Sequence, residues 1–111
     1  GVDDVPAATT STGRVLLCER EDTAARAAGA DPQVLAAVRV AGHAIVDGEF
    51  DPVLAGAAAP VRGFHGGIVA ALTVSGPAER LRPHLPAHAA ATASAASALS
   101  AALGASAPRA R

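Results

Sequence analysis

Two hydroxyl side chains, Thr73 and Ser75, interrupt the most strand-like stretch of this 111-residue sequence, IVAALTVS. Because alternate residues of a strand share one face, both hydroxyls point to the same side of the sheet, while Leu72 and Val74 point to the other. Two hydroxyls on one face can bind a single small polar ligand through hydrogen bonds. The alternative, which these residues alone favour, is structural: Thr73 suits a strand, and Ser75 suits the turn that follows.

Histidine and cysteine residues offer other chemistry, but they do not form a set. His84 and His88 have the i, i+4 spacing that binds a metal on one helix, yet Pro86 lies between them and no third ligand is near. Cys18 has no neighbouring His or cationic helix start to activate it, so a nucleophile is not expected. Its apolar neighbours instead indicate a small core residue.

Acidic and glycine-rich segments have simple structural explanations. Asp47 and Glu49 are i and i+2 in an extended segment, which fits turn and surface residues at least as well as a carboxylate pair. The GFHGG segment lacks the strand-to-helix pattern of a phosphate-binding loop and predicts a hairpin turn. We therefore expect no catalytic residues, no metal and no cofactor, and we expect that the chain is not an enzyme.

The composition limits the class of protein. The net charge is -1, half of the residues are apolar and only two are aromatic, so the core must be built from Ala, Val, Leu and Ile. The arginines are scattered among acidic residues, which argues against a basic surface for nucleic acid. No apolar run reaches the roughly eighteen residues of a membrane span, and a single cysteine cannot form an internal disulfide. We expect one small domain or part of one, in the cytoplasm and not on a membrane.

The first forty residues predict helices. Hydroxyl residues stand before GRVLLCER and predict a helix start capped by Ser11 or Thr12, and a short second helix should follow. The next helix, residues 32–41, should have Asp31 as its N-cap and Gly42 at its end. This pattern places Ser11 and Thr12 at a helix N-terminus.

The rest of the chain is first extended and then helical again. After a short strand in HAIV, residues 54–75 predict an antiparallel pair joined by the GFHGG turn, in which Pro60 favours a strand edge or a strand end. An Ala-rich helix over residues 87–104 should close the domain, with Leu99 and Leu103 on the side that it buries.

With these elements placed, residues 42–77 resemble the effector-binding domain of bacterial transcriptional regulators of the isocitrate-lyase-repressor (IclR) family. That family has a G-[YF]-A motif, a D-x-E motif, an A-A-P-V motif, and an A-L-S-[VI]-S-G-P motif followed by R-L. The matching residues are Gly42 with Ala44, Asp47 with Glu49, Ala58 to Val61, Ala71 to Pro77, and Arg80 with Leu81. Weaker matches, PAATTSTGRVLL and ALSAALG, extend the resemblance over residues 5–104. It implies an α+β fold of the GAF-like or profilin-like type, an antiparallel sheet flanked by helices.

The resemblance implies a ligand-sensing, oligomerising domain that binds a small organic acid as its effector. In the family the pocket is lined by strand hydroxyls and by backbone amides at the start of the first helix, groups that suit a carboxylate. The effector-binding residues implied here are Ser11, Thr12, Gly13, Val46, Asp47, Gly56, Thr73 and Ser75. With the resemblance, a pocket explains the two strand hydroxyls better than strand preference alone.

The resemblance also implies a larger protein. Intact family members carry an N-terminal winged helix-turn-helix that binds DNA, and this chain resembles only the second half of the effector-binding domain. Residues 1–111 are therefore expected to form a partial effector-binding domain, either a fragment or a natural truncation. We expect DNA binding only through an N-terminal domain outside this chain, and association into a homodimer or tetramer.

Two departures from the family concern the ligand. Members that bind short acids such as glyoxylate tend to have an acidic residue where Val46 stands and a cysteine where Gly56 stands. The resemblance thus implies a roomier and less polar pocket, for an aromatic or aliphatic acid larger than a short keto acid. Two alternatives stay open: a dimerisation module whose pocket is vestigial, and a small enzyme on a similar fold.

Overall fold

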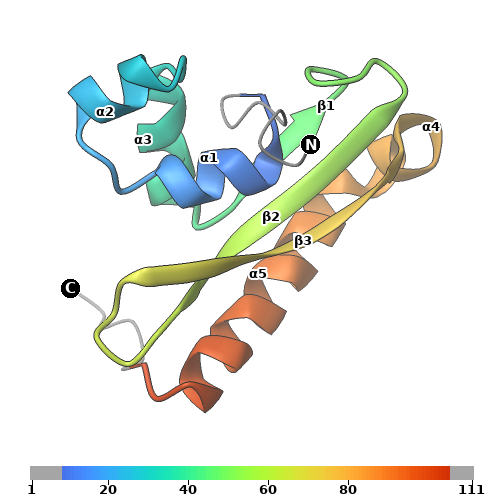
Figure 1. The fold of residues 1–111 in the computed structure, drawn as a ribbon. Helices are drawn as coiled ribbons and strands as arrows, with labels where there is room; N and C mark the ends of the chain where they lie inside the picture. Colours follow the sequence, from blue (N-terminus) through green and yellow to red (C-terminus); the bar gives the residue numbers. More distant parts are fainter. Residues whose placement is uncertain (1–8, 106–111) are drawn as a thin grey trace, which may run out of the picture.

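The computed structural model describes residues 9–105, in which short helices and strands lead to one long final helix (Figure 1). In chain order the elements are α1 (Ser11–Leu17), α2 (Asp22–Ala27), α3 (Pro32–Ala41), β1 (Ala44–Asp47), β2 (Leu54–Arg62), β3 (Ile68–Pro77), α4 (Ala78–Leu81), the 3-10 helix η2 (Arg82–His84) and α5 (Leu85–Ala102). The strands form one antiparallel sheet in the order β1-β2-β3. The predicted α+β class, an antiparallel sheet flanked by helices, is confirmed.

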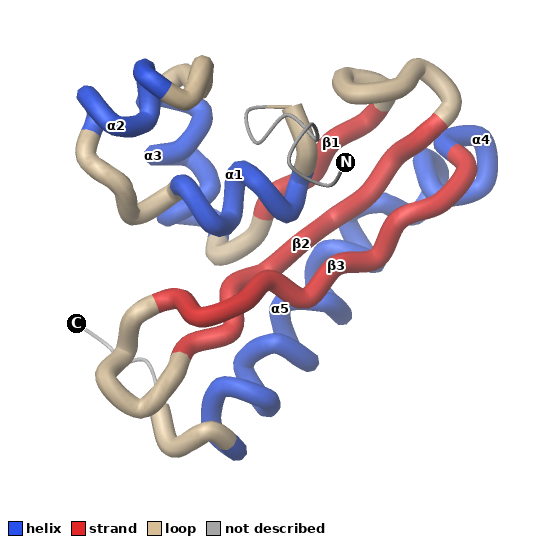
Figure 2. The backbone as a smooth tube through the Cα atoms, in the orientation of Figure 1, coloured by secondary structure: helices blue, strands red, loops and turns tan. Residues whose placement is uncertain are grey.

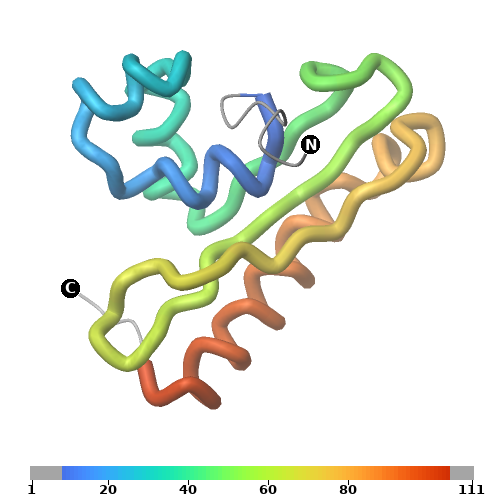
Figure 3. The backbone as a smooth tube through the Cα atoms, in the orientation of Figure 1, coloured from blue at the N-terminus to red at the C-terminus, as the bar shows by residue number. Residues whose placement is uncertain are grey.

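Helices cover both faces of the central strand β2 (Figures 1 and 3). Successive residues of a strand point to opposite faces, yet five consecutive residues of β2 are all buried. Ala58 packs with Val15 of α1 and Val38 of α3 on one face. Ala59 packs with Ala96 of α5 on the other face. The sheet therefore lies between an N-terminal helical layer and α5.

Small side chains join α5 to the sheet. Along one face of this helix every third or fourth residue is buried: Leu85, Ala89, Thr92, Ala96 and Ser100. Leu99 and Leu103 are 44% and 48% exposed, so the prediction that they form the buried side is wrong. The alanines of β2 present a flat surface on which a helix packs closely through its own small residues, and the leucines are left on the outer side.

The third helix forms as the sequence predicts. The Asp31 carboxylate accepts a hydrogen bond from the Gln33 backbone N–H at 2.8 Å, which caps the start of α3. The helix ends at Gly42, whose φ of 78° lies in the left-handed region that favours glycine. The predicted range of residues 32–41 is confirmed.

Strands β2 and β3 form the hairpin expected for residues 54–75, with Gly66 at φ 86° in the turn (Figure 2). β2 is the central strand, an uncommon place for a proline. Pairing with β1 ends where Ala44 meets Ala58, so in the described sheet only β3 lies beside Pro60. The predicted strand edge thus exists locally at Pro60, although β2 is central elsewhere.

Arg62, at the end of β2, connects three parts of the fold. Its guanidinium donates to the two Glu19 carboxylate oxygens at 3.0 and 2.7 Å and to the Gly66 carbonyl at 2.8 Å. Its backbone N–H donates to the Ser100 hydroxyl at 2.8 Å. One residue therefore ties the end of α1, the hairpin turn and α5 together.

Candidate functional site

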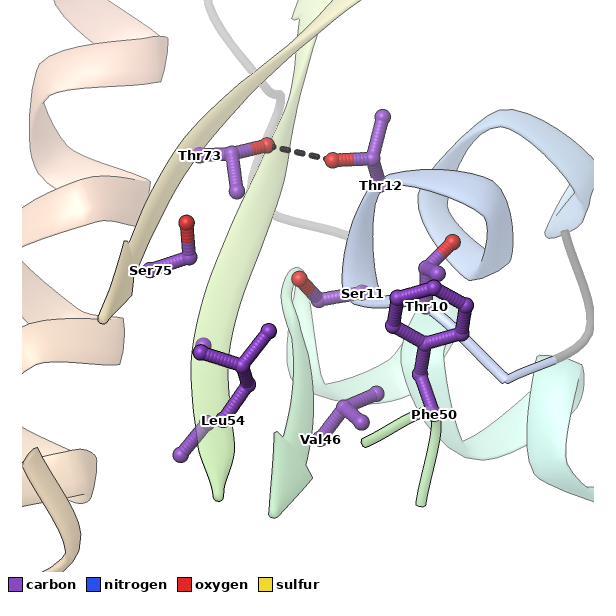
Figure 4. A pocket seen from close by; sticks show the side chains of 10 residues that line it. Thr10, Ser11, Thr12, Val46, Phe50, Leu54, Thr73 and Ser75 are labelled. Atoms are coloured by element: carbon purple, nitrogen blue, oxygen red, sulfur yellow. Dashed lines mark hydrogen bonds between the residues drawn. The ribbon is translucent and has the colours of Figure 1, made fainter. Parts of the chain in front are cut away.

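A pocket of about 340 Å³ lies between the start of α1 and the sheet (Figure 4). Its walls come from the N-terminus of α1, the loop between β1 and β2, and all three strands. The lining residues are Thr10, Ser11, Thr12, Val46, Phe50, Leu54, Ala55, Gly56, Thr73 and Ser75. Six of the eight residues implied by the family resemblance are in this lining, and Gly13 and Asp47 are outside it.

Hydroxyl groups from two elements meet across the pocket. Thr73 and Ser75 lie two residues apart on β3, so both face α1, as the strand period predicts. The hydroxyl oxygens of Thr12 and Thr73 are 2.7 Å apart and share a hydrogen bond. The Ser11 side chain belongs to the same wall as Thr12. A small polar ligand in the pocket would therefore meet hydroxyl groups on both sides.

The start of α1 presents side chains, but not the Gly13 amide, to the pocket. Thr10 is the N-cap, and its side chain accepts a hydrogen bond from the Gly13 N–H at 3.1 Å. The prediction that Ser11 or Thr12 caps this helix is therefore wrong. Because Thr10 occupies the Gly13 N–H, that amide is not available to a ligand, and Gly13 itself is buried. Ser11 and Thr12 contribute their side chains to the pocket wall.

Strand β1 presents Val46 to the pocket and Asp47 to the opposite face. Val46 pairs with Gly56 on the side of the sheet that faces α1. The next residue, Asp47, points the other way, and its carboxylate accepts hydrogen bonds from Arg82 at 2.7 and 2.9 Å. These hydrogen bonds lower the pKa of the Asp47 carboxyl. Strand alternation, applied to the sequence, could have separated the two residues.

Gly56 permits close packing at the floor of the pocket. A β-carbon at this position would lie 2.9 Å from the Val74 carbonyl oxygen, 3.2 Å from the Ser75 Cβ and 3.5 Å from the Ser11 hydroxyl oxygen. The first of these distances is shorter than real contacts of a β-carbon, and a backbone atom cannot move aside cheaply. The space beside Gly56 is therefore already occupied in part, and a cysteine would not simply fill a gap.

Four lining residues were not found from the sequence: Thr10, Phe50, Leu54 and Ala55. Leu54 was within reach, because it lies two residues before Gly56 and so shares its face of β2. Phe50 could not be predicted, because it lies in a loop, where the sequence has no regular spacing that shows which way a side chain points.

The chemistry of the lining is neutral. None of the lining residues in the described part of the chain is charged. The hydroxyls can donate hydrogen bonds, and Val46, Phe50 and Leu54 supply hydrocarbon surface. The pocket can therefore accept a ligand with one strongly accepting group and an apolar body.

The other candidate residues lie apart from this pocket. The rings of His84 and His88 meet edge to face with centroids 6.5 Å apart. Over residues 9–105, no group of three or more His, Cys, Asp and Glu side chains is placed to hold a metal ion. Cys18 is buried beside α1, and this burial raises the pKa of its thiol. None of the helices within that same range has the length and apolarity that crossing a membrane requires.

Solved structures share this fold. The Agobacterium tumefaciens repressor BlcR has a TM-score of 0.81 and 23% identity over 91% of this chain and 48% of that chain. The C-terminal domain of the E. coli transcriptional regulator KdgR has a TM-score of 0.75 and 26% identity over 89% of this chain and 71% of that domain. Pseudomonas aeruginosa HmgR has a TM-score of 0.76 and 27% identity over 91% of this chain and 46% of that chain. The chain thus spans about half the length of BlcR and HmgR.

A family model gives the assignment. No curated protein sequence matches the chain. The model described as bacterial transcriptional regulator IclR C-terminal matches residues 32–101, which is more than half of the chain. The motifs between Gly42 and Pro77 lie within that match, and the resemblance inferred from them is confirmed. The chain therefore belongs to the IclR C-terminal family, the regulatory, effector-binding domain of bacterial transcriptional regulators.

Proposed function

We propose that this domain binds a small organic acid in the pocket between α1 and the sheet, and that this acid is the effector of the regulator. One observation carries the proposal: the hydroxyl oxygens of Thr12 and Thr73 lie 2.7 Å apart, beside Ser75, in a pocket that also has apolar walls. Membership of the family supports it, because the family is that of a regulatory, effector-binding domain.

An acid fits the chemistry of the lining. Hydroxyl donors form stronger hydrogen bonds to a charged acceptor than to a neutral one, about 1.5 to 3 kcal/mol each. No acidic side chain among the described lining residues would repel a carboxylate. Val46, Phe50 and Leu54 offer hydrocarbon surface to the rest of the ligand. An aromatic or aliphatic acid therefore suits the pocket better than a short polar keto acid.

The proposed role of the effector is to control DNA binding by a winged helix-turn-helix domain outside this chain. KdgR, whose C-terminal domain is 26% identical to this chain, is a transcriptional regulator, which supports the role. A regulator of this kind acts on DNA in the cytoplasm. On this proposal, the present chain alone does not shift an operator fragment in a gel. A sequence-specific shift by this chain would contradict the proposal that DNA binding belongs to a separate domain.

Association into a homodimer or tetramer is part of the same proposal. Strand β3 is at the edge of the described sheet, so one side of its backbone has no strand beside it there. Val69 of β3 is 63% exposed, and Phe64 of the adjoining turn is 74% exposed. Open edges and exposed apolar side chains are commonly covered by another copy. Sedimentation should find a species larger than the monomer, and a monomer at high concentration would contradict it.

The acid-binding proposal is tested by removing the strand hydroxyls. Thr73→Val combined with Ser75→Ala should weaken binding of an aromatic acid by about a hundredfold, since two charge-assisted hydrogen bonds are lost. The loss of stability should be limited to that of the Thr12–Thr73 hydrogen bond, about 0.5 to 1.5 kcal/mol, because valine and alanine are compatible with a strand and both residues are exposed. Isothermal titration calorimetry measures the affinity, and circular dichroism measures the unfolding.

A matched control removes two hydroxyls elsewhere. Ser94 and Ser97 lie on the exposed side of α5, and replacing both by alanine should leave the affinity unchanged. If the parent chain binds none of a panel of carboxylic acids, the proposal fails and a dimerisation module with a vestigial pocket remains. If the parent binds acids and the Thr73 and Ser75 variant binds them equally well, the acid does not sit at these hydroxyls.

A further inference from the structure

Phe50 is the one aromatic side chain among the lining residues that the structure describes. It belongs to the loop between β1 and β2 and is 49% exposed. Figure 4 shows Phe50 and Leu54 on opposite sides of Val46, with the hydroxyls of Thr73 and Ser75 across the pocket from the ring. A ligand that meets those hydroxyls must therefore have an additional apolar part if it is also to touch Phe50.

The loop that carries Phe50 is held together by hydrogen bonds between its own residues. The Gly48 N–H donates to the Leu54 carbonyl at 2.9 Å, and the Leu54 N–H donates to the Asp51 carbonyl at 2.9 Å. The Val53 N–H donates to an Asp51 carboxylate oxygen at 3.0 Å. These hydrogen bonds fix the shape of the loop, so its position depends on how it is attached to the rest of the domain.

An ion pair attaches the loop to α1. Arg14 donates two hydrogen bonds to the Glu49 carboxylate, at 3.2 and 2.5 Å. The Arg14 side chain is 12% exposed and that of Glu49 is 47% exposed, so a partly buried guanidinium holds a carboxylate at the surface. A two-point contact of this kind fixes orientation as well as distance. Glu49 directly precedes Phe50, and Arg14 follows Thr12 by two residues, so the pair joins the aromatic wall to the helix with the hydroxyls.

We propose that Phe50 determines the specificity of the pocket, selecting an acid with an aromatic or bulky aliphatic body, and that Arg14 and Glu49 are the residues that position it. The inference rests on the proposed function. The carboxylate meets the hydroxyls, and the apolar body fills the space up to the Phe50 ring, where aromatic contacts add to the burial of surface. An acid without that body reaches the hydroxyls and makes no contact with the ring.

Two acids that differ only by a phenyl group test the role of Phe50: 3-phenylpropionate and propionate. In NMR titrations, which measure weak binding, Phe50→Ala should weaken 3-phenylpropionate about tenfold and leave propionate unchanged. If Phe50→Ala lowers the affinity for both acids equally, or for neither, the inference about Phe50 is overturned, and the proposal that the pocket binds acids is unaffected. If the parent chain binds neither acid, the proposed function and the inference both fail.

The positioning role is tested by Glu49→Gln, with Glu19→Gln as the matched control. Glu19 also forms a two-point ion pair with an arginine, Arg62, and its side chain is 43% exposed, close to the 47% of Glu49. Glu49→Gln should lower the preference for 3-phenylpropionate over propionate about two- to fivefold, and Glu19→Gln should not change it. A change of this ratio in both variants, or in neither, removes Arg14 and Glu49 from the inference.

Fluorescence gives an independent measurement. The chain contains no Trp and no Tyr, so the Phe50→Trp variant has a single indole, placed at the pocket. Saturation with 3-phenylpropionate should change its emission. The Phe64→Trp variant, at a position 74% exposed on the hairpin turn, should show no change. Unchanged emission of the Phe50→Trp variant, under conditions where calorimetry detects binding, would overturn the contact with Phe50.

Discussion

Gly56 and Ser75 face each other directly across the β2–β3 pair, at the floor of the pocket. The pairing is close enough that a β-carbon on Gly56 would come within 2.9 Å of the neighbouring Val74 carbonyl. The same β-carbon would lie 3.2 Å from the Ser75 Cβ and 3.5 Å from the Ser11 hydroxyl oxygen, so a side chain at position 56 would also crowd these two residues. A cysteine at position 56 would therefore change the packing of the two strands as well as the size of the pocket.

Replacing Gly56 by alanine should destabilise the fold by about 1 to 3 kcal/mol, because β3 must shift away from β2 to admit the methyl group. Urea unfolding measures the change. Gly67→Ala is the control, since a β-carbon on Gly67 would have no atom within 4 Å and its φ is not positive. Equal stability of the parent and the Gly56→Ala variant would show that the two strands separate without cost.

The hydrogen bond between Thr12 and Thr73 should couple α1 to β3. A double-mutant cycle with Thr12→Val and Thr73→Val should give a coupling of about 0.5 to 1.5 kcal/mol in the free energy of unfolding, the usual net value of a hydrogen bond. Chemical unfolding of the parent, both single variants and the double variant measures it. Additive effects would mean that the hydrogen bond between Thr12 and Thr73 contributes nothing to the free energy of unfolding.

Much of the fold could be predicted because its elements have local causes. Asp31 and Gly42 delimit α3 by capping and by left-handed geometry, which depend on neighbouring residues only. The hairpin follows from a glycine turn between two apolar runs. The buried side of α5 could not be read from Leu99 and Leu103, because it depends on the alanines of β2, which are distant in the sequence.

The site divides in the same way. Thr73 and Ser75 could be assigned to one face from the strand period, and the structure places both in the pocket lining. Phe50 could not be assigned, because it lies in a loop, and that loop is joined by Glu49 to Arg14, 35 residues away in the chain. Contacts between distant loops and helices have no periodic trace in the sequence.

The revised buried face of α5 predicts opposite results at two neighbouring positions. Ala96 is 1% exposed, so Ala96→Leu should overpack the contact with β2 and cost about 1 to 3 kcal/mol. Leu99 is 44% exposed, so Leu99→Ser should change the unfolding free energy of the monomer by about 0.5 kcal/mol or less. Urea unfolding at low protein concentration measures both, and the reverse order would restore Leu99 to the buried side.

Cys18 should react slowly with thiol reagents in the native protein. The side chain is 3% exposed, and burial raises the pKa of its thiol above the ordinary 9.0, so little reactive thiolate is present at neutral pH. Ellman's reagent should label it fully in denaturant and much more slowly under native conditions. Rapid labelling of the native chain at a rate near that of the denatured one would contradict this packing.

The ion pair between Glu19 and Arg62 should make part of the stability depend on pH. The hydrogen bonds that Glu19 accepts from Arg62 lower the pKa of the Glu19 carboxyl below the 4.5 of an unperturbed glutamate. A carboxyl whose pKa is lower in the folded state stabilises the fold when it is ionised, so this contribution is present above pH 4.5. It is lost as the pH falls through the lower, folded-state pKa, because Glu19 is then protonated in both states.

Glu19→Gln should therefore be less stable than the parent at pH 7, and the difference should narrow as the pH falls below 4.5. Asp47, whose pKa is also lowered, by Arg82, is present in both proteins and does not affect the difference. Urea unfolding of both proteins across this pH range measures it, with Glu79→Gln, an exposed glutamate of α4, as the control. A difference that stays constant down to strongly acidic pH would mean that the charge of Glu19 does not hold the hairpin to α1.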